Sequence, residues 1–136
     1  MIYKPTTSSA IEFAFANRLE KWIHLFLCGE GDNKGLSDGL KLEPRRYYSP
    51  KLMDLGLFTR CCGPEDGLKW KLPKNPFDEN VNNIARKYSK GVWDMPPLIV
   101  NLENNIYVLS DGNHRHEALK KLGVIEYWVI IWETVG

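Results

Sequence analysis

The sequence lacks a long apolar run, a secretory leader and an even set of cysteines. No stretch has the roughly 18 consecutive apolar residues that indicate a membrane-spanning helix. The first residues, Met-Ile-Tyr-Lys-Pro, lack the basic-then-apolar pattern of a signal peptide. Its three cysteines are an odd number, which favours a reducing compartment over a disulfide framework. We therefore expect a soluble, cytoplasmic protein with no membrane partner.

The chain also has almost no net charge. It carries 18 Lys and Arg against 17 Asp and Glu, a formal charge of +1. This balance removes the overall basic field that drives sequence-independent nucleic-acid binding, so DNA is a disfavoured partner and only a local basic patch stays open. With 136 residues, 43% apolar content and five Trp, the chain has the material for one core, and we expect one compact domain.

The usual metal-binding patterns are missing as well. His24 and Cys28 lie four residues apart, but two ligands do not make a site. Cys61 and Cys62 are adjacent and lack the two-residue spacer of a zinc knuckle, so we interpret them as a buried pair of thiols. The polar, Gly-rich 29–35 segment is not followed by Gly-Lys-Ser/Thr and lacks the acidic pattern of a calcium loop. We expect no metal site, and a linker or lid at 29–35.

Residues 1–47 predict a helical extension and a linker. Apolar residues recur at helical spacing from Ile11 to Cys28, which predicts one amphipathic helix of about five turns. Ser9 and Glu12 are spaced as a capping box at its start. Further along, Pro44-Arg-Arg-Tyr-Tyr48 sets two arginines beside two tyrosines. That combination can meet a nucleotide or single-stranded nucleic acid, but it also fits a solvated turn.

Residues 48–136 show the patterns of a small mixed sheet with helices packed on it, which is an α/β fold. Helical spacing of apolar residues predicts a helix over 79–89, and Glu103-Asn104-Asn105 predicts a hairpin turn. Apolar runs of strand length predict strands at 52–58, 98–102, 106–109 and 127–132. The last run is uninterrupted, so we expect that strand to lie centrally in the sheet.

The most informative stretch is 106–123, which predicts a strand, a tight turn and a helix. Ser110-Asp111-Gly112 is turn chemistry, either Asp111 or Asn113 can cap the helix, and Gly123 ends it.

Three basic residues crowd the start of this predicted helix. His114, Arg115 and His116 lie where the helix dipole is already positive and where acidic residues are ordinarily favoured. A bound phosphate would offset these charges, so we predict a phosphate site with Arg115 largely exposed, and a merely solvated helix start is the alternative. Because the helix end and Arg115 both disfavour imidazolium, the pKa of each histidine should lie below its ordinary value.

The 111–123 segment resembles the signature helix of the ParB/sulfiredoxin superfamily, on Asp111-Gly112-Asn113-His114-Arg115, Glu117-Ala118-Leu119 and Leu122-Gly123. Sulfiredoxins carry Gly-Cys-His-Arg with the Cys as nucleophile, and Asn113 at that position argues against sulfinic-acid reductase chemistry. ParB partition proteins carry Gly-Glu-Arg-Arg, of which Gly112 and Arg115 match. Free-serine kinases carry Asp-Gly-His-His-Arg, from which only Asn113 departs, so the motif is most similar to theirs.

The resemblance implies a nucleotide, ATP, ADP or CTP, with Mg²⁺ as a further cofactor, because in each branch this helix start meets nucleotide phosphates. The implied phosphate-binding residues are Gly112, Asn113, His114, Arg115 and His116. Arg115 and His114 would neutralise charge that grows in the transition state, and Asp111 would position Mg²⁺ or an acceptor hydroxyl.

A kinase or NTPase is the activity that we predict, transferring a phosphoryl group to a small-molecule acceptor or hydrolysing the nucleotide. Its catalytic residues would be Asp111, His114 and Glu65. Glu65 is the candidate general base because it lies in a loop after a predicted strand, where ligand-contacting residues tend to be placed. Two alternatives stay open, a non-catalytic nucleotide-switched binding module and a ParB-like DNA-binding or nuclease protein.

Overall fold

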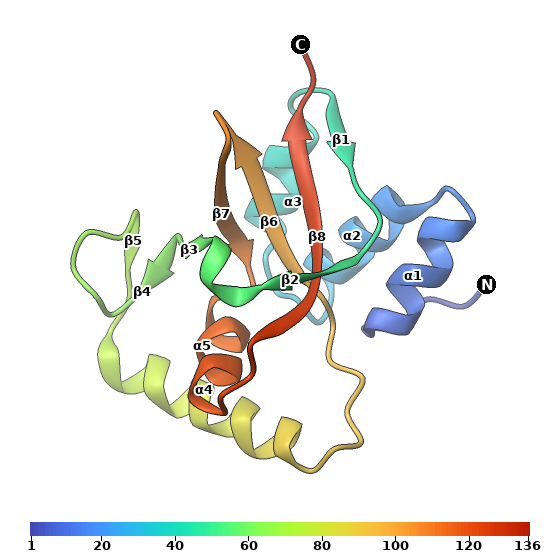
Figure 1. The fold of residues 1–136 in the computed structure, drawn as a ribbon. Coiled ribbons are helices and arrows are strands. Elements are labelled where there is room, and N and C mark those ends of the chain that lie inside the picture. The colour runs from blue at the N-terminus through green and yellow to red at the C-terminus, as the bar shows by residue number, and fades with distance from the viewer.

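The computed structural model describes residues 1–136, which form one mixed α/β assembly of the predicted class (Figure 1). Its helices are α1 (Thr7–Phe15), α2 (Leu19–Cys28), α3 (Lys34–Leu40), α4 (Lys74–Ser89) and α5 (Asn113–Lys121). Its strands are β1 (Arg45–Tyr47), β2 (Lys51–Asp54), β3 (Thr59–Arg60), β4 (Cys62–Gly63), β5 (Trp70–Lys71), β6 (Leu98–Glu103), β7 (Ile106–Asp111) and β8 (Glu126–Thr134). None of these helices combines the length and the apolar content that a membrane span requires.

The main sheet has the strand order β1-β8-β6-β7-β3, and β2 also pairs with β8. β8 is antiparallel to β1 and β2 on one side and parallel to β6 on the other. β6 and β7 form an antiparallel hairpin, and β3 adds to β7 in parallel. As its uninterrupted apolar run predicts, β8 lies inside the sheet, with β6 and β1 beside it (Figure 1). A separate small sheet joins β4 and β5.

The β6–β7 turn has the conformation that its sequence predicts. Asn104 and Asn105 both have positive φ, 52° and 62°, as a two-residue type I′ turn requires and as Asn tolerates. β7 runs past the predicted end at residue 109 and continues to Asp111. The longer strand carries Asp111 directly to the start of α5.

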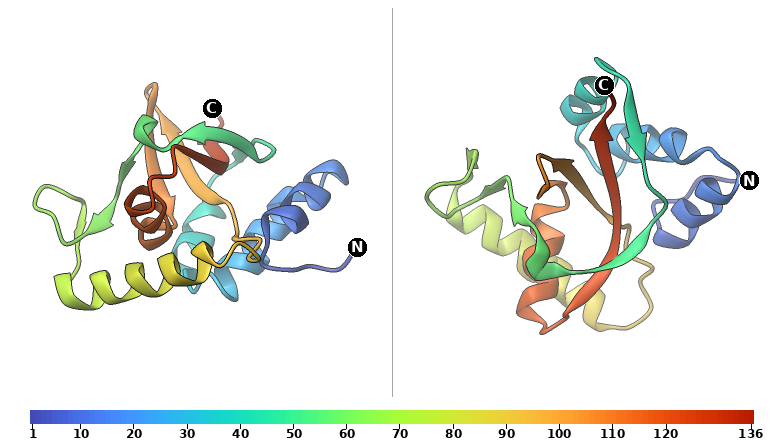
Figure 2. Two further views of the ribbon diagram at one scale, coloured as in Figure 1. Left: turned by 60° about the horizontal axis from the view of Figure 1, so that its bottom comes forward. Right: turned by 45° about the horizontal axis from the view of Figure 1, so that its top comes forward.

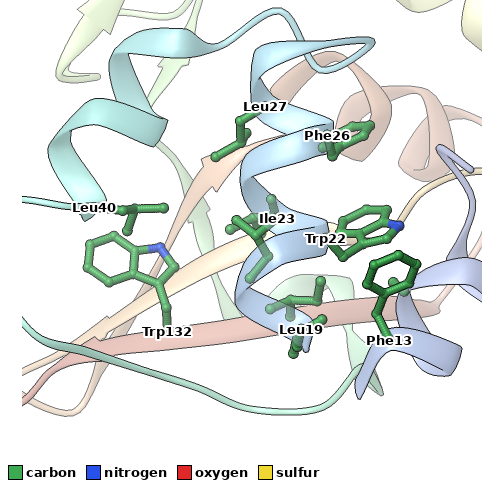
Figure 3. Close-up of a cluster of buried hydrophobic side chains, with 11 residues drawn as sticks. Phe13, Leu19, Trp22, Ile23, Phe26, Leu27, Leu40 and Trp132 are labelled. Carbon is green, nitrogen blue, oxygen red and sulfur yellow. The ribbon is translucent and has the colours of Figure 1, made fainter. Parts of the chain in front are cut away.

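One face of the sheet is covered by the N-terminal helices. Ile99 and Ile130 point to this face, and the helices α1, α2 and α3 bury their apolar side chains against them. Figure 3 shows this cluster, with Trp22 and Phe26 stacked at 5.1 Å between ring centroids and Trp132 close to Leu40. The 1–47 segment therefore supplies the helical cover of this face.

The opposite face packs against α5. Leu98 and Val100 alternate with Ile99 along β6 and so point to this second side, as strand geometry dictates. They form a cluster with Leu119 of α5. α4 adds an outer layer on α5 through a small cluster that includes Val81 and Ala118, and Figure 2 shows α4 running alongside α5.

The predicted single helix over 11–28 is wrong, because the chain breaks it at residues 16–18. α1 ends at Phe15 and α2 begins at Leu19, with Asn17 between them at a φ of 59°. The apolar spacing continues through the break because both helices face the same cluster, but Phe15 points outward and is 90% exposed. The capping box is wrong as well, since Thr6 caps α1 by accepting the Ser9 N–H.

Three other boundaries differ from the predictions. A strand was predicted to residue 58, but β2 ends at Asp54. The Asp54 carboxylate accepts the Gly56 N–H and so caps a short 3-10 helix, η1 (Leu55–Leu57). The 29–35 segment is not a free linker, because α3 begins at Lys34. α4 begins at Lys74, earlier than the predicted residue 79, directly after Pro73, which cannot donate a hydrogen bond but fits a helix start.

The Arg and Tyr cluster at 44–48 belongs to the sheet edge. Arg45, in β1, donates to the carbonyls of Leu40 and Gly39 and lies 5.0 Å from the ring centroid of Trp132. Arg46 pairs with Glu133 across the β1–β8 ladder at 3.6 Å. These contacts join β1 to β8, so residues 45–47 form an edge strand in place of a solvated turn, with the Arg46 side chain exposed.

Candidate functional site

The turn between β7 and α5 gives the site its shape. Gly112 takes a left-handed conformation with a φ of 99°, and a Cβ there would lie 2.7 Å from a methyl group of Leu98. α5 follows with no side-chain cap, so the predicted capping by Asp111 or Asn113 is wrong. The N–H groups of its first turn therefore have no acceptor within the helix.

Asp111 is buried, 7% exposed, and both of its carboxylate oxygens are occupied. Oδ1 accepts the side-chain amide of Asn33 at 2.9 Å, and Oδ2 accepts the Arg115 guanidinium at 3.0 Å. Asn33 also caps α3 by accepting the Leu36 N–H. Asp111 thus ties the N-terminal helices to the start of α5, and Asp111 and Arg115 form a buried ion pair.

Arg115 is not exposed, which corrects the prediction made from its place at a helix start. Its side chain is buried, with the residue 8% exposed, and Nη1 donates to the carbonyls of Pro96 and Pro97 at 2.6 and 2.9 Å. Burial lowers the pKa of Arg115, and the Asp111 carboxylate opposes that shift. The guanidinium also lies 5.4 Å from the ring centroid of Phe26, in α2. Arg115 therefore holds three segments together beneath the turn.

The two histidines of the motif point in different directions. His114 lines a cleft at the start of α5 and packs on Phe77 with 4.6 Å between ring centroids. His116 is buried, with Nε2 3.0 Å from the carbonyl of Leu55, and does not line the cleft. The phosphate-binding role predicted for His116 is therefore wrong in placement, because residues two apart on a helix lie on nearly opposite sides.

The pKa of each histidine is lowered, in the predicted direction. Burial is the largest cause for both, and the charge of Arg60 adds to it. For His114 the Asp111 carboxylate opposes the shift, and for His116 the hydrogen bond with Leu55 does. Burial is thus a larger cause than the helix end and Arg115, from which the direction was predicted.

Glu65 does not lie in the cleft. Its carboxylate pairs with the guanidinium of Arg60, which also pairs with Glu117 of α5 at 3.3 Å. The Glu65 side chain is 44% exposed on the outside of the β4 turn. The predicted general base therefore lies on the surface, because the turn after β4 directs it toward Arg60.

The cleft itself has a volume of about 530 Å³ and lies between α5 and the N-terminal helices. Its lining includes every predicted residue from Asp111 to Arg115. It also includes residues that no sequence motif marks. Glu30, Asp32 and Asn33 come from the loop before α3, Lys87 comes from α4, and Trp93 comes from the connector after α4. The Gly-rich polar composition of 29–35 was a signal for this loop, although it was interpreted there as a linker or lid.

The adjacent cysteines lie at the edge of this cleft. Cys62 lines it, while Cys61 and Cys62 are both free thiols of intermediate exposure, so the pair is less buried than predicted. Elsewhere, His24 and Cys28 both contact the hydroxyl of Ser37. No group of three or more His, Cys, Asp or Glu side chains converges as a metal site.

No protein-family model and no curated protein matches the sequence. Among solved structures, a Pnob8-like ParB-N domain is similar, with 23% sequence identity and a TM-score of 0.46. This chain is similar to a ParB-N domain. The alignment covers 69% of this chain and 33% of the other, so this chain spans about a third of that chain's length. At this identity and TM-score, the similarity carries no argument about ligand or reaction.

Proposed function

We propose that this chain binds a nucleotide, with the phosphates at the start of α5 and the base against the wall formed by α4 and the connector that follows it. The observation that supports this most directly is the uncapped first turn after Gly112, which faces the cleft. Helix N-termini with free N–H groups and a nearby glycine bind phosphates because the N–H groups and the dipole both favour negative charge.

The positive groups around this turn support a phosphate ligand. Lys87 and His114 line the cleft and are the basic side chains with freedom to contact a ligand. Arg115 also lines it, but its guanidinium is engaged with the Pro96 and Pro97 carbonyls and with Asp111. Arg115 would therefore fix the turn and add positive potential beneath it. Lys87, His114 and the backbone N–H groups would contact the phosphates directly.

An apolar wall in the same cleft suits a nucleoside. Leu72, Ile84 and Trp93 line it, and the Lys87 ammonium lies 4.0 Å from the centroid of the Trp93 ring. An indole face can stack on a base whatever its identity, and a neighbouring cation can contact the adjoining phosphate. The ammonium lies over one face of the ring, so a base would stack on that face only after Lys87 has moved to the adjoining phosphate.

The acidic residues of the cleft fit a reaction that uses Mg²⁺. Glu30 and Asp32 line it from the loop before α3, and Glu30 accepts the Tyr3 hydroxyl at 2.7 Å. Mg²⁺ is commonly bound by one or two carboxylates together with substrate phosphates, so Glu30 and Asp32 are the residues that would hold it and help neutralise phosphate charge. Asp111, with both oxygens occupied, would orient the turn. We propose phosphoryl transfer or nucleotide hydrolysis as the reaction.

Calorimetry with ATP, ADP, AMP and CTP, each with and without Mg²⁺, tests the binding proposal. We expect saturable binding of at least one nucleotide, tighter for those with more phosphates. A flat titration with all four nucleotides would contradict nucleotide binding. A coupled assay for released phosphate and a phosphate-transfer screen with small hydroxyl compounds then test the reaction.

A non-catalytic, nucleotide-switched binding module is the second candidate. It is favoured by the full occupation of Asp111, which leaves no free carboxylate on the α5 side of the cleft. Tight binding without turnover, unchanged by Glu30→Gln and Asp32→Asn, would support this module over the enzyme.

A further inference from the structure

Cys61 and Cys62 form a close pair of reduced thiols beside the cleft. Their Sγ atoms lie 3.2 Å apart at the junction of β3 and β4, and neither sulfur is in a disulfide. Both residues are partly exposed, so a small reagent can approach them. A disulfide has an S–S distance of about 2.0 Å. The two sulfurs must therefore approach by about 1.2 Å to form a bond, with an adjustment of the peptide between them.

The same pair is connected to the first turn of α5. Asn113 is 7% exposed, and its side-chain Oδ1 accepts the Cys62 backbone N–H at 3.1 Å. Its Nδ2 donates to Sγ of Cys61 at 3.7 Å. One amide side chain thus contacts both cysteines, and the residue that carries it opens the helix at the proposed phosphate site.

We propose that Cys61 and Cys62 are a modification site that a low-molecular-weight disulfide oxidises reversibly to a vicinal disulfide, releasing Asn113 from the pair. This inference goes beyond the nucleotide proposal and does not depend on it. It assigns a chemical role to the two thiols that the cleft chemistry does not use.

The reaction proceeds by two thiol–disulfide exchanges. The Cys61 thiolate attacks one sulfur of the small disulfide, forming a mixed disulfide and releasing one small thiol. Cys62 then loses its proton and attacks Sγ of Cys61, releasing the second small thiol. Two protein thiols are oxidised by two electrons, the small disulfide is reduced to two thiols, and the two protein protons appear on those thiols. The first attack falls to Cys61, because the Asn113 amide donates to its Sγ and supports negative charge there. Burial and the contact with Cys61 raise the pKa of Cys62, and the charge of Cys61 no longer contributes once Cys61 is in the mixed disulfide.

The resulting bond should be easy to reduce. Adjacent Cα atoms lie about 3.8 Å apart, below the roughly 4.4 Å at which ordinary disulfides begin. Strained disulfides are the labile ones, so this pair suits reversible modification more than structural cross-linking. Closing the ring also shifts the Cys62 N–H and Cys61 Sγ that Asn113 contacts.

The test uses the full chain with Cys28→Ser, which removes the exposed cysteine at the end of α2. After incubation in glutathione redox buffers, thiol counting and intact mass should show both thiols lost together, with no glutathione retained. Dithiothreitol should restore both. Peptide mapping of the wild-type chain should place the bond between residues 61 and 62.

Cys61→Ser and Cys62→Ser, in the same Cys28→Ser background, are the matched controls with one thiol each. We expect the Cys62→Ser protein to keep a stable glutathione adduct, because its second exchange is blocked. In the Cys28→Ser protein, a persistent glutathione adduct, a bond between two chains, or two thiols that stay free would each overturn the proposal.

Hydrogen exchange of the oxidised and reduced forms tests the connection to α5. The Cys62 amide, which donates to Asn113, should exchange faster in the oxidised protein. Equal exchange in a protein shown to carry the bond would overturn the proposed release of Asn113.

Discussion

The two sides of the cleft are built in opposite ways. On the α5 side, Asp111 and Arg115 are buried, and both carboxylate oxygens and both terminal guanidinium nitrogens have partners. On the other side, the loop at 29–33 presents the Glu30 and Asp32 carboxylates from exposed positions. The Asp111 to Arg115 motif therefore serves mainly to hold the structure of the site in place. The groups free to meet a ligand come largely from segments that no motif marks.

The largest expected effect comes from breaking the buried side. Arg115→Ala leaves the Asp111 carboxylate without its guanidinium partner and the Pro96 and Pro97 carbonyls without donors. Removing one partner of a buried ion pair costs about 3 to 5 kcal/mol, so the free energy of unfolding at pH 7 should fall by that order. Urea denaturation measures it. A loss below about 1 kcal/mol would show that the pair is not structural.

The connection between the two sides should contribute less. Asn33→Ala removes both the cap of α3 and the hydrogen bond to Asp111, with an expected loss of about 1 to 2 kcal/mol. Asn33→Ser keeps a capping hydroxyl but lacks the amide that reaches Asp111. Urea denaturation of both variants separates the contribution of the α3 cap from that of the hydrogen bond to Asp111. If Asn33→Ser is as stable as the wild type, the Asn33 to Asp111 hydrogen bond contributes nothing; if the two variants lose equal stability, the cap contributes nothing beyond that bond.

The exposed groups should affect binding without affecting stability. Lys87→Ala should weaken nucleotide binding roughly 10- to 100-fold, the range expected for one hydrogen bond to a charged group. Its free energy of unfolding should stay within about 0.5 kcal/mol of the wild type. Lys90→Ala, at the end of the same helix and outside the cleft, is the matched control for calorimetry. An equal loss in both variants would assign the effect to net charge.

The smallest effect separates the two histidines by pH. The folded-state pKa values of His114 and His116 are lowered, so their contribution to stability is present above the unfolded-state pKa of about 6.5 and is lost as pH falls below it. Urea denaturation between pH 7.5 and 5.5 should show this decline, and His116→Gln should make it shallower.

Proton uptake on nucleotide binding should also distinguish His114 from His116. His114 lines the cleft and His116 does not, so proton uptake on binding near pH 6.5 should disappear in His114→Gln and persist in His116→Gln. Calorimetry in two buffers of different ionisation enthalpy measures that uptake. Uptake that depends on His116 would contradict the placement of the phosphates.

Local patterns predicted the central strands of the sheet and the helix after Gly112. The β6–β7 hairpin, the inner position of β8 and the helix after Gly112 each follow from residues close together in the sequence. The break at Asn17 was missed because the apolar spacing continues across it. The burial of Arg115 was missed because the carbonyls that surround it, Pro96 and Pro97, come from a different segment.

The second side of the cleft lay beyond sequence reasoning for a related reason. The hydrogen bond from Asn33 to Asp111 joins residues 78 positions apart. Nothing in the 29–35 composition identifies its partner, because the docking depends on how α2 and α3 pack on the sheet. Single-sequence periodicity gives the elements but not the tertiary contacts between them.

The inner position of β8 has a consequence for how the chain acquires its structure during synthesis. β8 pairs with β1 and β2 on one side and with β6 on the other, yet it follows all three in the chain and is synthesised after them. Until residues 126–134 emerge, β1 and β2 lack a pairing partner, and α1 and α2 lack the Ile130 and Trp132 side chains that complete their cluster. Pairing between such distant segments is slow and leaves apolar surface exposed meanwhile. The partly synthesised chain is therefore expected to be prone to aggregation until β8 is inserted.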